Sequence, residues 1–125
     1  MATTTAQAAS WSTLPSVGGI PGRVLQAYRA AQVRLAQEQP RCALTWPVLA
    51  GIGQVESGHG RAGGAGTSAA GVVSPRIIGV PLDGSGPVAR VLDSDDGRYD
   101  GDRDLDRAVG PMQFLPGTWT TYAAD

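Results

Sequence analysis

Apolar residues recur at helical spacing in the first third of the chain. Between Pro21 and Gln39 they alternate with arginine and glutamine, so that a helix here would have one apolar face, made of Val24, Leu25, Tyr28, Ala31, Val33 and Leu35. Pro21 suits the first turn of a helix, and Pro40 disfavours helical backbone in the residue before it. The pattern therefore predicts a helix over residues 21–39.

A second apolar stretch predicts a shorter helix from about Thr45 to Gly58. Thr45 suits the N-cap, Pro47 is tolerated in the first turn, and a glycine commonly ends a helix. Gly51 and Gly53 lie inside this stretch, and each weakens a helix by roughly 1 kcal/mol relative to alanine. We expect another helix or a bound substrate to approach closely at these two glycines and to offset that loss.

The middle of the chain lacks helical periodicity. Residues 61–74 are rich in glycine, alanine and serine, which is typical of a loop. Two β-branched runs, 76–82 and 88–92, flank an Asp-Gly turn and predict a short hairpin. Pro81 and Pro87 restrict this hairpin to a small, edge-like piece.

The last third begins with a highly charged stretch. Residues 93–107 hold seven aspartates and three arginines, and we expect a solvated surface loop there. Pro116 then opens a short final helix. Together these elements predict an α+β fold that is mostly helical and has a small inserted hairpin.

Length and composition favour a single globular domain. An apolar content of 42% is typical of a folded chain, whereas residues 1–19 are rich in alanine, threonine and serine and predict a flexible lead-in. The folded domain would span residues 20–125. The only cysteine, Cys42, is either a small buried apolar residue or half of a disulfide. We expect its disulfide partner to lie beyond residue 125.

Glu56 is the candidate catalytic residue. It lies on the last turn of the predicted second helix, and the only other glutamate, Glu38, lies in a polar stretch. At the end of an apolar helix, desolvation would favour the neutral carboxylic acid, which is the form that a general acid needs. The hydroxyl of Ser57 would hydrogen-bond this carboxyl or the substrate, and the glycines that follow would let a sugar approach the backbone.

Two segments carry a resemblance to a known family. The first contains Glu56-Ser57 and the second is Gly110-Pro111-Met112-Gln113-Phe114. In this order, with the predicted hairpin and acidic loop between them, they resemble the lytic transglycosylases, which cleave peptidoglycan. The layout is similar to the membrane-bound lytic murein transglycosylase B branch of actinobacteria and covers roughly residues 20–125. The family's later Ala-Tyr-Asn-type motif is absent, which implies a domain incomplete at its C-terminus.

The resemblance implies a lysozyme-like fold, an extracytoplasmic location and one catalytic carboxylate. Glu56 would protonate the oxygen that links MurNAc to GlcNAc and then deprotonate the C6 hydroxyl of the same sugar, giving a 1,6-anhydro end. No second carboxylate is needed if the acetamido group of the sugar stabilises the cation at C1. Ser57 would orient Glu56, Gln113 would bind sugar or acetamido groups, and Met112 would pack beneath the site. Tyr99 is a further candidate for substrate binding.

The resemblance also has a consequence for stability. It implies further helices that cover a set of apolar side chains, so we expect these to be exposed here: Leu49, Ile52, Val55, Phe114 and Trp119. Each large apolar side chain stabilises a fold by roughly 1.5–3 kcal/mol when it is buried. The 125 residues alone should then be weakly stable and nearly inactive.

Two other functions stay open. A lysozyme-type muramidase would use an aspartate of the acidic loop to activate water, and a degenerate domain would bind glycan strands without cleaving them. A formal net charge of −1 gives no electrostatic reason to expect nucleic acid as a partner. No apolar run approaches the ~20 residues of a membrane span, and the N-terminus lacks the features of an intact signal peptide.

We expect no cofactor and no metal. One histidine and one cysteine do not make a zinc ligand set. In the acidic loop, neither of two EF-hand registers places suitable ligands at all the required positions. A Ser-His hydrolase is not expected, because a nucleophile elbow needs a glycine two residues before Ser57 and the chain has Val55 there. We therefore expect His59 at the surface or at the rim of a groove.

Overall fold

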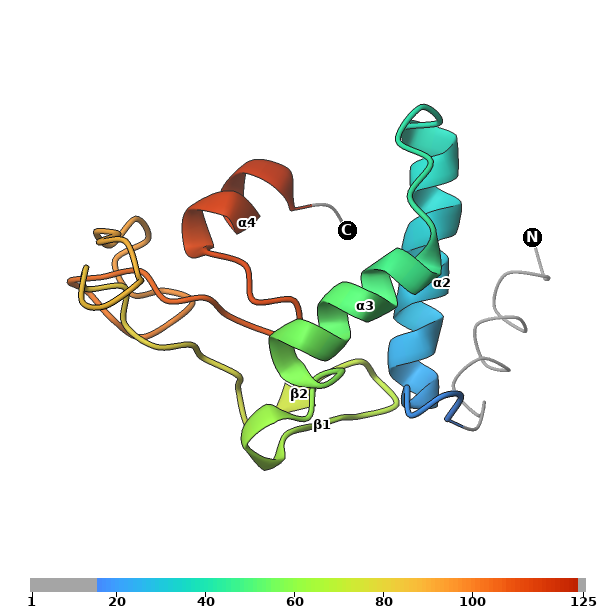
Figure 1. The fold of residues 1–125 in the computed structure, drawn as a ribbon, viewed down its shortest axis with the longest axis horizontal. Coiled ribbons are helices and arrows are strands. Elements are labelled where there is room, and N and C mark those ends of the chain that lie inside the picture. Colours follow the sequence, from blue (N-terminus) through green and yellow to red (C-terminus); the bar gives the residue numbers. More distant parts are fainter. Residues whose placement is uncertain (1–15, 124–125) are drawn as a thin grey trace.

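The computed structural model describes residues 16–123, and residues 1–15 and 124–125 lie outside that range. The described chain contains three α-helices, α2 (Gly22–Glu38), α3 (Trp46–Ser57) and α4 (Pro116–Tyr122). It also contains one antiparallel hairpin, β1 (Gly66–Thr67) and β2 (Val73–Ser74), which a 3₁₀ turn at Ala62–Gly64 precedes. The chain is thus a small, mostly helical α+β fold, as the sequence predicts (Figure 1).

The described chain begins with a tight turn. Most of the predicted flexible segment, residues 1–15, lies outside the described residues. Val17 and Ile20 exchange two backbone hydrogen bonds, of 3.1 and 2.9 Å, around Gly18 and Gly19. Ile20 is buried and belongs to the core.

The helix boundaries follow the predictions closely. α2 begins directly after Pro21 and ends just before Gln39. α3 begins after Thr45, which takes the N-cap position although its hydroxyl makes no capping hydrogen bond. Gly58 ends α3 in the left-handed conformation, with φ of 57°, which glycine adopts without the steric cost of a Cβ.

The core lies where α2 and α3 cross (Figure 1). Leu25 of α2 is fully buried, and the other buried members of the cluster are Ile20, Val24, Tyr28 and Ala50. Three partly buried side chains pack against it: Trp46, Leu49 and Met112. Because Met112 belongs to the second motif segment, that segment is anchored on the contact between the two helices.

Gly53 is a point of close approach between the helices. A Cβ at Gly53 would coincide with the hydroxyl of Tyr28, so only glycine fits there without a shift of the tyrosine. The predicted close approach of another helix is therefore confirmed for Gly53. It is wrong for Gly51, because no other helix comes within 4 Å of the place where its Cβ would stand, and the alternative of a substrate at Gly51 stays a prediction.

The strands do not lie where the sequence predicts them. β1 and β2 fall inside residues 61–74, which we expected to be a loop. Ser68 organises their connection, since its hydroxyl accepts a hydrogen bond of 3.1 Å from the N–H of Val72. Two-residue strands leave no alternation of apolar and polar residues to detect in the sequence.

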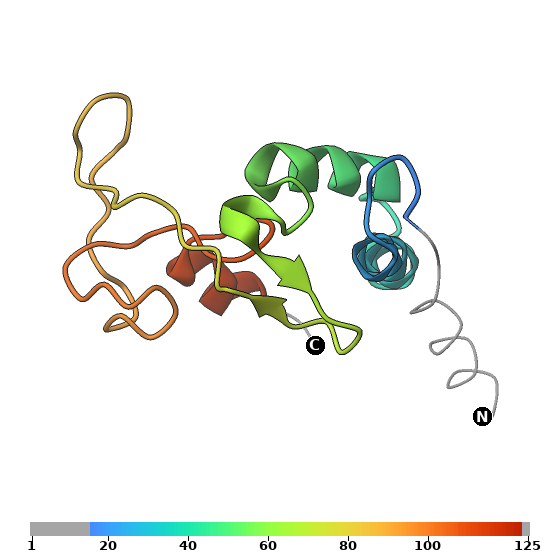
Figure 2. The ribbon, with the colours of Figure 1, turned by 90° about the horizontal axis from the view of Figure 1, so that it is seen from below.

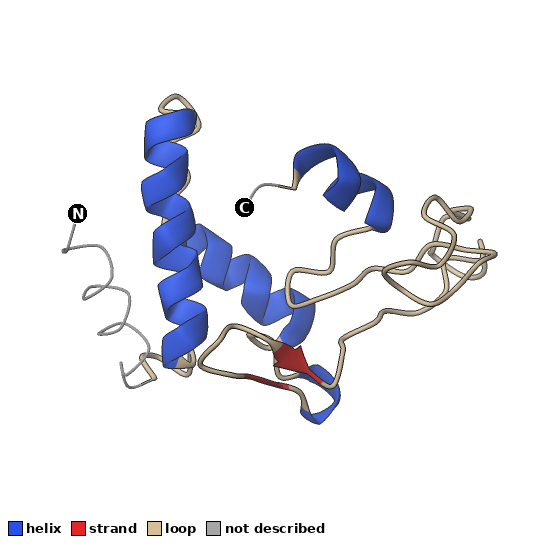
Figure 3. Ribbon diagram, turned by 180° about the vertical axis from the view of Figure 1, so that it is seen from behind, coloured by secondary structure: helices blue, strands red, loops and turns tan. Residues whose placement is uncertain are grey.

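The predicted hairpin over residues 76–92 forms only in part. Within the described chain one bridge closes it, between Asp83, which directly follows the first run, and Arg90 of the second. Pro81 and Pro87 lack the N–H groups that a longer ladder would need. Figures 2 and 3 show the result, a set of loops over residues 80–107 that extends away from α2.

Residues 109–114 form a tight turn that carries the second motif. The N–H groups of Val109 and Phe114 each donate to the carbonyl of the other, at 2.9 and 3.1 Å. The segment 77–79 runs beside this turn, with a bridge between Ile78 and Val109. The turn is thus closed by its own pair of hydrogen bonds and joined to the segment 77–79 before the chain enters α4.

Several large apolar side chains are exposed. Ile52, Val55, Phe114 and Trp119 face solvent as expected, whereas Leu49 packs against the core. No described helix has both the length and the apolar character that a bilayer crossing requires.

Cys42 is exposed and free in the described chain. The alternative of a small buried apolar residue is therefore wrong. The predicted disulfide to a cysteine beyond residue 125 stays a prediction.

Candidate functional site

Glu56 lies on the last turn of α3, and its side chain is exposed. The apolar residues beside it are exposed as well, Ile52 by 43% and Val55 by 84%. The prediction that an apolar setting desolvates this carboxylate is therefore wrong for the described chain. An exposed carboxylate is accessible to a ligand, and a ligand that covers it would exclude water from it.

Ser57 joins the two motif segments. Its hydroxyl donates to the carbonyl of Pro111 at 2.6 Å and accepts from the N–H of Gly60 at 2.8 Å. Ser57 is buried, and these bonds engage its hydroxyl with the main chain rather than with the carboxyl of Glu56. The glutamate is thus held one residue away from a fixed link to the 109–114 turn.

Gln113 shapes that turn from within. Its side-chain Nε2 donates to the carbonyl of Gly110 at 2.9 Å. Its backbone takes the left-handed conformation, with φ of 51°, which costs a residue with a side chain about 1–3 kcal/mol and is often found at functional sites. Its Oε1 lies beside Gly79, where an added Cβ would stand only 3.0 Å away.

A cavity of about 650 Å³ lies between α2, the hairpin and the 109–114 turn. Among the predicted site residues, Met112 and Tyr99 line it, whereas Glu56, Ser57 and Gln113 do not. Its volume is within the range of about 300–1,000 Å³ that is typical of ligand pockets. The other lining residues are mostly apolar: Arg23, Val24, Ala27, Tyr28, Ala31, Leu49, Thr67, Gly71, Val73, Val109, Gly110, Pro111, Phe114 and Trp119.

Sequence reasoning missed the wall that α2 contributes to this cavity. Arg23 braces the β1–β2 connection against α2, because its Nε donates to the carbonyl of Ala69 at 3.3 Å. Its guanidinium also fills the space beside Gly71. No motif marks Arg23 or Tyr28 as site residues, and the apolar face of α2 predicts only a core.

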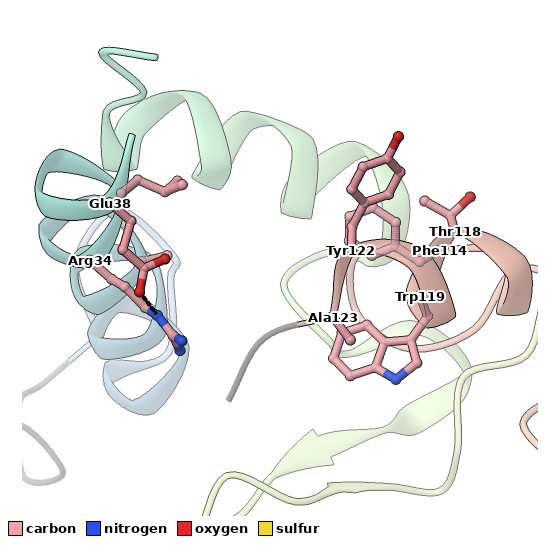
Figure 4. A pocket seen from close by; sticks show the side chains of 9 residues that line it. Arg34, Glu38, Phe114, Thr118, Trp119, Tyr122 and Ala123 are labelled. Carbon is pink, nitrogen blue, oxygen red and sulfur yellow. Dashed lines mark hydrogen bonds and ion pairs between the residues drawn. The ribbon is translucent and has the colours of Figure 1, made fainter. Parts of the chain in front are cut away.

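A smaller cavity of about 420 Å³ shares Ala31, Phe114 and Trp119 with the first. Figure 4 shows that Arg34 and Glu38 of α2 lie across this opening from the apolar side chains of α4 and its approach. Arg34 Nε donates to Glu38 Oε1 at 2.8 Å. This exposed pair adds little stability, so the cavity is mainly an apolar surface with one polar edge.

His59 is buried, at 5% exposure, so the prediction of a surface or rim position is wrong. The hydroxyl of Tyr28 and His59 Nδ1 share a hydrogen bond of 2.9 Å. Burial lowers the pKa of the imidazole, and the charge of Arg61 lowers it further. Burial also raises the pKa of the Tyr28 phenol. At neutral pH a neutral phenol and a neutral imidazole therefore share this hydrogen bond.

The acidic loop is only partly solvated, which corrects the prediction for two of its aspartates. Asp100 and Asp106 are buried, at 5% and 2% exposure. Asp100 accepts hydrogen bonds from the N–H groups of Asp102 and Arg107, at 2.9 and 2.8 Å. Asp106 accepts from the N–H and the hydroxyl of Ser94, at 3.1 and 2.6 Å. These bonds replace the water that a buried carboxylate loses.

Three carboxylates of this loop gather at one point. Asp93, Asp95 and Asp106 each place one oxygen within 4.8 Å of the others. Asp95 Oδ1 is buried and has no hydrogen-bond partner in the described chain. Oxygen ligands of this kind suit Ca²⁺ or Mg²⁺, so these are the described residues best suited to a cation.

Replacing Asp95 by asparagine should stabilise the chain at neutral pH. Burial raises the pKa of the Asp95 carboxyl, the N–H of Tyr99 opposes this, and Asp93 and Asp100 raise it further. Because the folded-state pKa is above the unfolded one, the ionised form costs stability, and this cost disappears as the pH falls through the folded-state pKa. Asp95→Asn removes the charge and keeps an acceptor for Tyr99. In a thermal melt with a chelator, we expect Tm to rise by a few degrees.

The exposed Asp104 offers a matched control for this melt. Asp104→Asn removes the same charge from the same loop and should leave Tm nearly unchanged. A lower Tm for Asp95→Asn would contradict the like-charge repulsion and would indicate a positively charged partner of the cluster.

Comparison of the chain with models of protein families, with curated proteins and with solved structures found no match. The functional inference therefore rests on the two motif segments and on the described geometry around them.

Proposed function

We propose that the chain is a lytic transglycosylase domain that cleaves the β-1,4 bond between MurNAc and GlcNAc in peptidoglycan. The observation that carries this proposal is the hydrogen bond of 2.6 Å between Ser57 and Pro111, which are 54 positions apart in sequence. It brings the end of the Glu56 helix to the turn that contains Met112 and Gln113. The two segments that carry the resemblance are thus joined in space as well as ordered in sequence.

Glu56 acts twice in the proposed reaction. Its carboxylic acid first protonates the glycosidic oxygen, and the bond from that oxygen to C1 of MurNAc breaks. The acetamido oxygen of the same sugar stabilises the positive charge at C1, which replaces a second carboxylate. The Glu56 carboxylate then takes the proton of the C6 hydroxyl while the oxygen of that hydroxyl bonds to C1. The products are a 1,6-anhydro end and a free GlcNAc hydroxyl, and no water is consumed.

The exposure of Glu56 sets a condition on this chemistry. A general acid needs a proton at neutral pH, and desolvation is the usual means of retaining it. In the described chain only a bound ligand would supply that desolvation. We propose that the glycan strand itself covers Glu56 and excludes water from it.

The large cavity supports the choice of an extended substrate. It is lined by Met112 and Tyr99, and its walls include Pro111, to which Ser57 is bonded. A strand that contacts Glu56 would therefore meet the 109–114 turn and the mouth of the cavity next to it. A lysozyme-like arrangement and an extracytoplasmic location, where peptidoglycan is found, belong to this proposal.

The mass of the released fragments tests the proposal. Purified peptidoglycan sacculi are incubated with the chain for long enough to collect products at the low rate expected of these 125 residues, and soluble fragments are analysed beside a lysozyme digest. We expect fragments that are lighter than the lysozyme products by one water, because the anhydro end retains none. Hydrated fragments would instead identify a muramidase that uses a loop aspartate. Binding to sacculi without release would identify a non-catalytic glycan-binding domain.

A further inference from the structure

We infer that Tyr28 and His59 are positioning residues for Glu56, because their buried hydrogen bond holds the turn that directly follows it. The inference rests on the proposed function. Their hydrogen bond does not involve the second motif, and neither residue transfers a proton in the proposed reaction. Their role would be to fix the position of the C-terminal end of α3.

The geometry around His59 is tightly determined. Its ring is buried, its Nδ1 shares a 2.9 Å hydrogen bond with the Tyr28 hydroxyl, and the two rings meet edge to face with centroids 5.8 Å apart. The backbone N–H of His59 donates to the carbonyl of Gly53 at 3.0 Å. Its backbone is left-handed, with φ of 61°, which is uncommon for a residue with a side chain.

The same turn continues into the link between the motif segments. Gly60, next to His59, donates its N–H to the Ser57 hydroxyl at 2.8 Å, and that hydroxyl donates to Pro111 at 2.6 Å. A hydrogen-bonded path thus runs from α2 through the turn to the second motif. Glu56 precedes Ser57 directly, so a shift of this turn would move Glu56 relative to the 109–114 turn.

A purely structural role would not need these groups. Two apolar side chains would fill the same space without the cost of burying a hydroxyl and an imidazole. A buried polar pair instead favours one orientation, since any other leaves a buried group without a partner. The pair therefore suits a site in which the position of one nearby carboxylate matters.

Tyr28→Phe is the first test. It keeps the ring beside Gly53 and removes only the hydroxyl that shares the hydrogen bond with His59. We expect the rate of anhydro-fragment release to fall on the order of 10- to 100-fold, the loss that a small misplacement of a catalytic group produces. Binding to sacculi should stay near the wild-type level. Tyr122→Phe, which removes a hydroxyl from an exposed tyrosine, is the matched control and should retain the wild-type rate.

Substitution of His59 separates positioning from folding. His59→Ala removes the imidazole and its hydrogen bond, whereas His59→Asn places Oδ1 near the position of Nδ1, where it accepts from the Tyr28 hydroxyl, and tolerates a left-handed backbone. We expect His59→Asn to recover most of the rate that His59→Ala loses. In ¹⁵N NMR spectra, the Nδ1 signal of His59 should change in Tyr28→Phe.

The outcomes separate this inference from the proposed function. A wild-type chain that releases no anhydro fragments overturns the proposed function, whatever the variants do. An active wild-type chain with Tyr28→Phe folded, as judged by circular dichroism, and fully active overturns the positioning role alone. If Tyr28→Phe and His59→Ala fail to fold, the activity of His59→Asn tests the positioning role. A folded His59→Asn variant with most of its activity supports the role, and a folded but inactive one contradicts it.

Discussion

Glu56→Gln is expected to abolish the release of anhydro fragments. Glutamine keeps the shape of the side chain but can neither give a proton to the glycosidic oxygen nor take one from the C6 hydroxyl. General acid–base groups contribute about 10²–10⁴-fold to rates, and Glu56 is required in both steps of the proposed reaction. We therefore expect a loss at or above the upper end of that range, measured as the initial rate of fragment release.

The only other glutamate provides the control for this substitution. Glu38 is exposed on α2 and pairs with Arg34, so Glu38→Gln removes an equal charge far from the proposed chemistry. It should leave the rate unchanged, and both variants should bind sacculi. A Glu56→Gln variant that still releases fragments at a near wild-type rate would exclude Glu56 as the catalytic acid.

Gly53→Ala is expected to have the largest effect on stability. The added methyl group would occupy the place of the Tyr28 hydroxyl. Overpacking costs about 1–3 kcal/mol, and loss of the Tyr28–His59 bond would leave buried polar groups unpaired at a further cost of about 1–3 kcal/mol. The better helix propensity of alanine returns about 1 kcal/mol. We expect a net loss of about 1–5 kcal/mol in the free energy of unfolding, measured by urea denaturation.

Gly51→Ala is the matched control, two residues earlier in the same helix. Apart from its chain neighbours and the backbone of α3, no described atom lies within 4 Å of the added methyl group, so only the gain in helix propensity of up to about 1 kcal/mol remains. The two substitutions should therefore shift the unfolding midpoint in opposite directions. If both variants were stabilised, the close contact between Tyr28 and Gly53 would not exist in solution.

The helices are the part of the fold that the sequence predicts well. The apolar face of α2, the proline before it and Gly58 after α3 are local signals, and each acts within a few residues of the element that it defines. The strands could not be found in the same way. β1 and β2 have two residues each, and their pairing depends on a turn organised by Ser68.

The sequence names candidate site residues but not their setting. The motif segments point to Glu56 and to the residues around Gln113 as candidates, and the structure links the two segments through Ser57. The sequence could not show that Glu56 is exposed, because exposure depends on what other segments cover. It also could not distinguish Gly53 from Gly51, since only the position of Tyr28 separates the two.

Buried polar residues were the main failure of sequence reasoning. His59 and Asp106 are types that are mostly exposed or only partly buried in proteins, yet both are buried here. His59 lies between two glycines and Asp106 between Leu105 and Arg107, and neither setting signals burial. Each is buried because a partner satisfies it, Tyr28 for His59 and Ser94 for Asp106. For His59 the partner lies 31 positions away in sequence, and no local pattern predicts such a pairing.

The most direct test of the proposed reaction is digestion of sacculi in water enriched in ¹⁸O. An intramolecular attack by the C6 hydroxyl takes no oxygen from the solvent, whereas hydrolysis places one solvent oxygen at C1 of every new end. We expect the chain to release fragments with no ¹⁸O at the new MurNAc end, while lysozyme in the same water gives labelled ends. Fragments from this chain that carry ¹⁸O at that position, with the label lost in Glu56→Gln, would contradict the transglycosylase reaction and establish a hydrolase.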